Sequence, residues 1–159
     1  MAPKSSQAIW SWEEKDLPIK KTVLNQIHKD LGARMVPFAG WEMPVRYSSV
    51  MEEHLAVRQT AGLFDVSHMG VFEISGPNAT IFLDVVFSNY AAWLNDGQSM
   101  YGYFLAPDGK VIDDGIIYKV RSDFYYLVIN ASNEAKDWEW LNAVNEGKVV
   151  LDQNRPWIK

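Results

Sequence analysis

Two adjacent aspartates, Asp113 and Asp114, are the residues of this 159-residue chain best suited by type and position to carry chemistry. They lie in the run Val111–Val120, which is joined to Met100–Leu105 by the turn-forming sequence Pro-Asp-Gly-Lys at 107–110. That arrangement predicts an antiparallel hairpin. Because neighbouring side chains of a strand point to opposite faces of a sheet, the two carboxylates cannot act on the same substrate atom.

Asp114 is expected on an apolar face of this hairpin. Alternation along the strand and pairing across the turn surround it with aliphatic and aromatic side chains: Tyr103 opposite Asp114, Tyr101 opposite Ile116, Leu105 opposite Ile112, and Tyr118 and Val120 further along. Burying an unpaired carboxylate is costly, so the group must find a hydrogen-bond donor or take up a proton. We therefore predict a carboxyl group tuned for proton transfer or for binding an amine. The alternative is that Asp114 only caps a nearby backbone turn.

Asp113 is expected to be an ordinary surface residue. It shares its face with Lys119, and a solvated ion pair between the two is the simplest interpretation.

A second cluster, Asp65, Ser67 and His68, has the residue types of a catalytic triad. In a strand, however, Ser67 and His68 face opposite ways, so no hydrolase triad is expected. Met69 shares the face of Asp65 and Ser67, and there it could wall a pocket or pack in the core.

Composition excludes several classes of function. The net charge is -5 and no run of Lys and Arg stands out, so neither a nucleic acid nor an anionic membrane is an expected partner. The chain has no cysteine, and its three histidines lack the spacing of metal ligands, so no metal site is expected. The first twenty residues match neither a signal peptide nor a transit peptide, which favours a cytoplasmic protein.

Periodicity and breaker residues predict the α+β class, with antiparallel sheet segments and packed helices. Residues 1–19 are interpreted as an N-terminal extension and 20–159 as one domain. Helices are expected at 20–30, 50–61, 78–86 and 133–146; the second has an N-cap at Ser49 completed by Glu52, and the last has Trp138, Leu141 and Val144 facing inward. Strands are expected at 34–38, 64–69, 71–75, 100–105, 111–120, 123–129 and 148–151.

Several segments, in order, resemble the aminomethyltransferase (T-protein) family of the glycine cleavage system. They are LGARMVPFAGWEMPV at 31–45, EHLAVR at 53–58, GLFDVSHMG at 62–70, GKVIDD at 109–114 and VINASN at 128–133. The resemblance covers about residues 21 to 155. It implies the N-terminal part of that family's folate-binding fold.

The resemblance also implies a reaction and a site. Members of the family pass a one-carbon unit from the aminomethyl-dihydrolipoyl arm of the H-protein to tetrahydrofolate, the acceptor substrate, and release ammonia. The second aspartate of the motif, here Asp114, is the family's key acidic residue beside the reacting folate nitrogens. The positions that match folate-lining residues are Met69, Tyr101, Ile116, Tyr118, Val128 and Asn130.

The family's chains are more than twice as long, so we expect a truncated domain that is inactive alone. Two alternatives keep the fold. One is a folate-dependent demethylase of a methylated sulfur or nitrogen compound. The other is a non-catalytic folate-binding relative, a class that often alters the Asp-Asp motif that this chain retains at Asp113 and Asp114.

Overall fold

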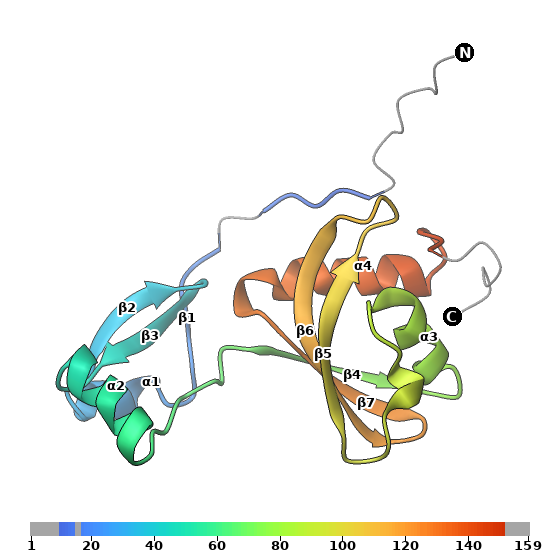
Figure 1. Cartoon of the computed structure of the whole chain (residues 1–159). Coiled ribbons are helices and arrows are strands. Elements are labelled where there is room, and N and C mark those ends of the chain that lie inside the picture. The colour runs from blue at the N-terminus through green and yellow to red at the C-terminus, as the bar shows by residue number, and fades with distance from the viewer. Residues whose placement is uncertain (1–9, 15–16, 152–159) are drawn as a thin grey trace. The chain divides into compact units, whose positions relative to one another are not determined.

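The computed structural model describes residues 10–14 and 17–151, and the chain divides into two compact units (Figure 1). We call Lys15–Met69 the amino-terminal unit, and Gly70–Lys159 together with Met1–Glu14 the sheet unit. The sequence-based division into an extension, 1–19, and a domain, 20–159, stays a prediction. In the part of the chain that the structure describes, no helix is long and apolar enough to cross a bilayer.

The sheet unit is built on four antiparallel strands, which confirms the expected α+β class. Their order is β4-β7-β6-β5, with β4 at Gly70–Ser75, β5 at Ser99–Leu105, β6 at Val111–Arg121 and β7 at Phe124–Ile129.

The predicted hairpin register is confirmed near the aspartates, where Tyr103 lies opposite Asp114 and Tyr101 opposite Ile116. The predicted pairing of Leu105 with Ile112 is wrong. A bulge after Phe104 shifts the register, so Leu105 pairs with Val111.

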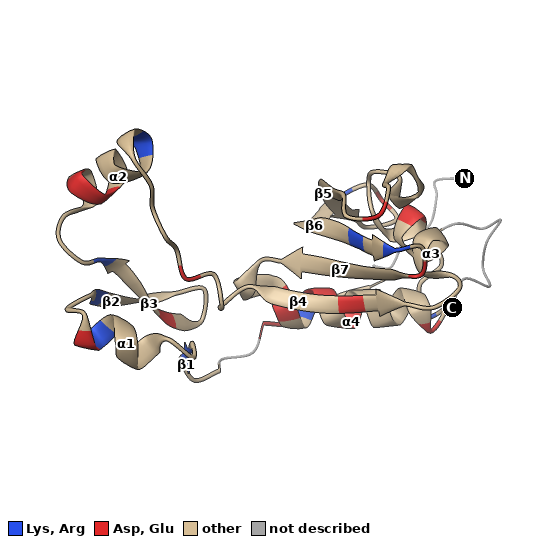
Figure 2. Ribbon diagram, turned by 90° about the horizontal axis from the view of Figure 1, so that it is seen from below, with Lys and Arg blue, Asp and Glu red and all other residues tan. Residues whose placement is uncertain are grey.

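Two helices pack against the same face of this sheet. They are α3 (Ala79–Val86) and α4 (Glu134–Asn145), accompanied by the short turns η1 (Ala91–Trp93) and η2 (Ala131–Asn133). Figure 2 shows α4 running along the sheet beside β4 and β7. The core between helices and strands is made of alternate strand residues and the inward helix stripes, among them Phe72, Phe104, Ile117, Leu127, Ile129, Leu83, Val86, Trp140 and Leu141. We call this the covered face of the sheet.

The inward stripe of α4 differs from the expected one. Trp140 is fully buried, whereas Trp138 is 54% exposed. The stripe runs through Asp137, Trp140, Leu141 and Val144, which are spaced i, i+3, i+4 and i+7. Trp10, inside the predicted extension, packs edge-on against Trp140 with the ring centroids 5.2 Å apart.

The strand predicted at 148–151 does not form. The backbone N–H of Val149 donates to the carbonyl of Ala143 at 3.0 Å, so the segment folds back onto the end of α4. Val149 is buried there, which explains the apolar run without a strand.

The amino-terminal unit combines a small sheet with two helices. Its elements are β1 (Lys20–Lys21), α1 (Asn25–Asp30), β2 (Arg34–Phe38), β3 (Trp41–Arg46) and α2 (Val50–Gln59), with the strand order β1-β3-β2.

The expected N-cap of α2 is present, since Ser49 Oγ accepts from the backbone N–H of Glu52 at 3.2 Å. The carboxylate that completes the cap is that of Glu53 rather than Glu52. It accepts from the backbone N–H groups of Tyr47 and Ser48 at 2.7 and 2.8 Å.

Asp65 is the polar centre of the amino-terminal unit. Its carboxylate accepts from Thr22 Oγ1 and from the backbone N–H of Ser67, each at 2.9 Å, and lies 2.9 Å from His28 Nε2. The other ring nitrogen of His28 lies 2.6 Å from the hydroxyl of Tyr47. Burial works to raise the pKa of Asp65, but the hydrogen bonds from Ser67, His28 and Thr22 outweigh it and hold the pKa well below its usual range.

This network also accounts for a wrong prediction. The segment 64–69 is not a strand but an irregular stretch that ends in a turn, in which the N–H of Met69 donates to the carbonyl of Val66 at 3.0 Å. The backbone bends there because the side chain of Asp65 takes up the N–H of Ser67.

Replacing Asp65 by alanine should lower the free energy of unfolding by about 3 kcal/mol at pH 7, because the groups of Thr22, His28 and Ser67 that bond to it lose their acceptor. The low folded-state pKa means that the contribution of Asp65 is complete above about pH 4 and is lost as the pH falls through the folded-state value. Urea unfolding at pH 7 and an acid titration followed by circular dichroism test both points. Asp30→Ala, at the exposed end of α1, is the control; an acid titration of Asp65→Ala identical to wild type would contradict the assignment.

Candidate active site

Six of the seven residues predicted for a site come together on one surface of the sheet unit. Tyr101 comes from β5, Asp114, Ile116 and Tyr118 come from β6, Val128 comes from β7, and Asn130 directly follows β7. Ile116 lies opposite both Tyr101 and Val128 in the sheet. The seventh residue, Met69, is half-buried and is the last residue of the amino-terminal unit.

This surface is the side of the sheet that points away from α3 and α4, and we call it the open face. It is formed by side chains that alternate with the core residues: Val71, Tyr101, Tyr103, Asp114, Ile116, Tyr118, Tyr126 and Val128. Tyr101, Tyr103 and Tyr118 are 50%, 42% and 41% exposed. The open face therefore offers a partly exposed aromatic and aliphatic surface with a carboxyl group among its side chains.

Asp114 is hydrogen-bonded by a side chain that follows the neighbouring strand. The side-chain amide of Asn130 donates to Asp114 Oδ1 at 3.0 Å and to the backbone carbonyl of Asp114 at 3.3 Å. Hydrogen bonding to Tyr103, burial and the neighbouring Asp114 together raise the pKa of the Tyr101 hydroxyl. Tyr101 thus stays protonated beside a half-buried carboxylate, where it can act as a donor.

The prediction for Asp113 is wrong. Asp113 is only 6% exposed and lies on the covered face, where its Oδ1 accepts from Asn130 and Asn133 at 3.0 and 2.7 Å. The amine of Lys119 donates instead to the carbonyl of Leu94 at 2.8 Å. Six residues along a strand span about 20 Å, so sharing a face did not bring Asp113 and Lys119 together.

Asp137 is the main residue that the sequence analysis missed. It is fully buried on α4, and neither of its oxygens nor Asp113 Oδ2 has a donor among the described side chains. Burial, together with hydrogen bonding to Asp113 and its charge, raises the pKa of Asp137 to about 9. With its pKa raised in this way, Asp137 is a neutral carboxylic acid at neutral pH and has an O–H group available as a hydrogen-bond donor. An acidic residue on the apolar stripe of a helix was the signal that could have revealed it.

The other cluster with chemical residue types does not form a catalytic arrangement. Ser67 Oγ donates to Asp65, and the ring of His68 packs edge-on against Phe38 with centroids 5.8 Å apart. Asp65 serves the structural network around His28 instead. In the described part of the chain, no three His, Cys, Asp or Glu side chains are grouped as a metal site requires.

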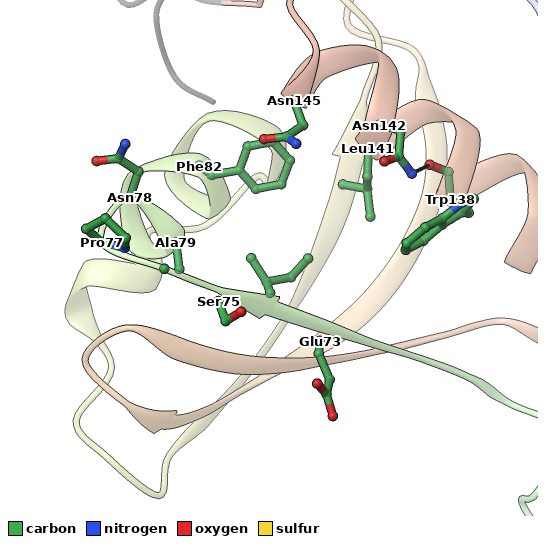
Figure 3. A pocket seen from close by; sticks show the side chains of 12 residues that line it. Glu73, Ser75, Pro77, Asn78, Ala79, Phe82, Trp138, Leu141, Asn142 and Asn145 are labelled. Atoms are coloured by element: carbon green, nitrogen blue, oxygen red, sulfur yellow. Dashed lines mark hydrogen bonds between the residues drawn. The ribbon is translucent and has the colours of Figure 1, made fainter.

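A pocket of about 250 Å³ lies in the sheet unit between the end of β4, the start of α3 and α4 (Figure 3). Phe82, Trp138, Asn142 and Asn145 line it, and Glu73 is its one ionisable lining residue. Figure 3 shows the Glu73 carboxylate directed away from these helix side chains. The pocket therefore brings no acid–base group into its interior, and the open face is the better candidate for chemistry.

Comparisons with known proteins agree on one family. The family model described as GCVT N-terminal domain matches residues 24–156. The chain is 54% identical over 128 residues to the aminomethyltransferase of Symbiobacterium thermophilum, covering 80% of this chain and 34% of that protein. It is 46% identical over 137 residues to the aminomethyltransferase of Chloroherpeton thalassium, covering 86% of this chain and 38% of that protein.

The structure is also similar to the crystal structure of glycine cleavage system aminomethyltransferase T from Bartonella henselae. The TM-score is 0.75 at 39% sequence identity, and the match covers 78% of this chain and 35% of that one. The chain spans a little over a third of the length of the curated relatives it matches.

Asp137 should make stability depend on pH. Its folded-state pKa, about 9, exceeds the unfolded value of about 3.9, so between the two the folded chain keeps a proton that the unfolded chain has released. The free energy of unfolding should therefore fall as the pH rises through this window, by up to about 1.4 kcal/mol per pH unit. Asp137→Asn should remove that slope in urea unfolding at pH 5, 7 and 9. Glu146→Gln, an exposed carboxyl just after α4, should keep the wild-type slope; an unchanged slope in Asp137→Asn would disprove the assignment.

Proposed function

We propose, from the premise that the chain belongs to the GCVT N-terminal domain family, that it forms the folate-facing part of a tetrahydrofolate-dependent aminomethyltransferase of glycine cleavage. The reaction moves a one-carbon unit from the aminomethyl-dihydrolipoyl arm of the H-protein to tetrahydrofolate and releases ammonia. The relatives named aminomethyltransferase are longer than this chain, so the proposal concerns the part of the site that these residues supply.

The observation that carries the proposal is the position of Asp114 on the open face. A folate has flat aromatic rings and ring amines, and it needs an apolar surface for the rings and a polar group beside the nitrogens. Tyr101, Tyr118, Ile116 and Val128 offer that surface around the carboxyl group of Asp114. The residues present therefore fit the ligand that the family resemblance implies.

In this proposal Asp114 orients the amine of tetrahydrofolate as a nucleophile and takes part in moving the proton as ammonia leaves. Asn130 holds Asp114 in place through the 3.0 Å bond to Oδ1. We assign Ile116, Val128 and the tyrosine rings to binding, and Met69 to the folate-contacting set on the family resemblance.

The retained aspartate pair supports a catalytic protein over a binding-only relative. Asn130 donates to both aspartates, and Asn133 donates to Asp113 as well. A carboxyl group held in this way beside an exposed aromatic surface is suited to proton transfer at a bound ring amine.

Asp114→Asn should weaken tetrahydrofolate binding about tenfold, because an oriented hydrogen bond to the ring amine is lost. It should lower turnover by about a hundredfold or more, because the amide cannot accept the proton. Binding is measured by calorimetric titration of the chain itself. Turnover with aminomethylated H-protein is measured after residues 24–151 replace the matching segment of the Symbiobacterium thermophilum relative, which is 54% identical over 128 residues.

Glu73→Gln is the matched control, since Glu73 is a carboxylate on the open face of β4, two strands from β6. It should change neither quantity. Wild-type turnover in Asp114→Asn would disprove the catalytic role, and undiminished binding in Tyr101→Ala would show that the open face is not the folate site.

A further inference from the structure

A series of polar side chains runs through the sheet from the core to the open face, and two of its members, Asp113 and Asp137, are not used in the proposed reaction. It begins at Asp137 on α4, passes through Asp113 and Asn130, and ends at Asp114. We propose that Asp137 is a positioning residue, a core acid that holds Asp113 and Asn130 and thereby sets the orientation of Asp114. This inference rests on the proposed function for the role of Asp114.

The first step of the chain is the contact between two buried carboxyl groups. Asp137 is fully buried and Asp113 is 6% exposed, and neither Asp113 Oδ2 nor either oxygen of Asp137 has a donor among the described residues. Two ionised carboxylates in contact within an apolar core would repel and remain unsolvated. A single proton held by Asp137 removes the repulsion and supplies a hydrogen bond to Asp113.

The second step is the amide of Asn130, which joins the two aspartates across the sheet. Its nitrogen lies 3.0 Å from Asp113 Oδ1 and 3.0 Å from Asp114 Oδ1. A side-chain amide has two N–H groups, so each aspartate can receive one of them. Asn133 donates to the same oxygen of Asp113 at 2.7 Å and holds that carboxylate from a second direction.

The amide can do this because Asn130 stands at the end of β7 rather than inside it. Ile129, the last residue of β7, pairs with Gly115, so Asn130 comes beside Asp114 where the strand stops. A side chain past the end of a strand is no longer confined to one face. Asn130 therefore reaches Asp113 on the covered face and Asp114 on the open face.

Loss of the acid at position 137 removes the first member of this series of polar side chains. Asp113 Oδ2 then becomes a buried acceptor without a donor, which is costly, and the carboxylate must turn toward another partner. Asn130 and Asn133 are the donors within reach, so that movement changes the geometry of the Asn130 amide. An asparagine at 137 keeps the side-chain shape and has an N–H donor, so it is expected to preserve the contacts of Asp113 and Asn130.

The test uses the full polypeptide with four substitutions. Asp137→Ala removes the donor, Asp137→Asn retains one, and Leu141→Ala truncates the same inward stripe of α4 one turn later without touching the polar groups. Asp137→Leu repeats the first change with the space filled, in case the alanine variant does not fold. The readouts are the side-chain amide resonances of Asn130 in ¹H–¹⁵N spectra, assigned by their loss in Asn130→Ser, and the affinity for tetrahydrofolate.

We expect Asp137→Ala or Asp137→Leu to shift the Asn130 amide resonances and to weaken tetrahydrofolate binding about tenfold, the effect of one lost oriented hydrogen bond. Asp137→Asn should retain both properties. Leu141→Ala should be less stable than wild type but retain both as well, which separates positioning from general loss of packing.

The inference is overturned if the Asn130 resonances do not move in Asp137→Ala and Asp137→Leu, if Asp137→Asn behaves like them, or if Leu141→Ala moves the resonances equally. If the wild-type chain binds tetrahydrofolate, unchanged affinity in Asp137→Ala and Asp137→Leu overturns it too. A wild-type chain that binds no tetrahydrofolate counts against the proposed function alone, because the Asn130 resonances still report on Asp137.

Discussion

A carboxyl group inside an apolar core must be neutralised or surrounded by donors, and the sheet unit meets both demands around Asp113. Asn130 and Asn133 donate to one of its oxygens, and burial together with the interaction with Asp113 raises the pKa of Asp137, so that only one of the two acids is charged at neutral pH. These partners come from the end of β7 and from α4. The packing of α4 on the sheet and the conformation of β6 at the aspartate pair therefore depend on each other.

The two faces of the sheet have different roles: one forms the core and the other is exposed. The covered face holds the core together with Asp113 and Asp137. Gly102 and Gly115 lie opposite each other there, and their lack of side chains lets core residues pack directly against the strands. A Cβ atom at Gly102 would come within 2.5 Å of the ring of Phe87, which packs edge-on against Phe104. The open face is free of this packing and presents its tyrosines and Asp114 half-exposed, as a surface for a ligand requires.

Much of the open face could be predicted from local pattern. The turn at 107–110 and the alternation along the two strands placed Tyr101, Tyr103 and Ile116 in the register that the structure shows. The bulge after Phe104 could not be predicted in this way, since it inserts one residue without a change in composition. At 64–69 the pattern failed because a side-chain contact of Asp65 replaced the backbone pairing of a strand.

The sequence by itself determined which side chains share a face, because the period of two in a strand and the geometry of a tight turn are local properties. It also determined the family, through motifs that stand in order along the chain. Only the tertiary structure decided which face is the core and what each aspartate contacts. That choice depends on the packing of α4 against β6, which joins Asp137 to Asp113 across 24 positions of the chain. Residues so far apart in the sequence show no periodic pattern that would predict their interaction. The acidic residue on the inward stripe of α4 indicated a buried polar group, but only the tertiary structure identified Asp113 as its partner.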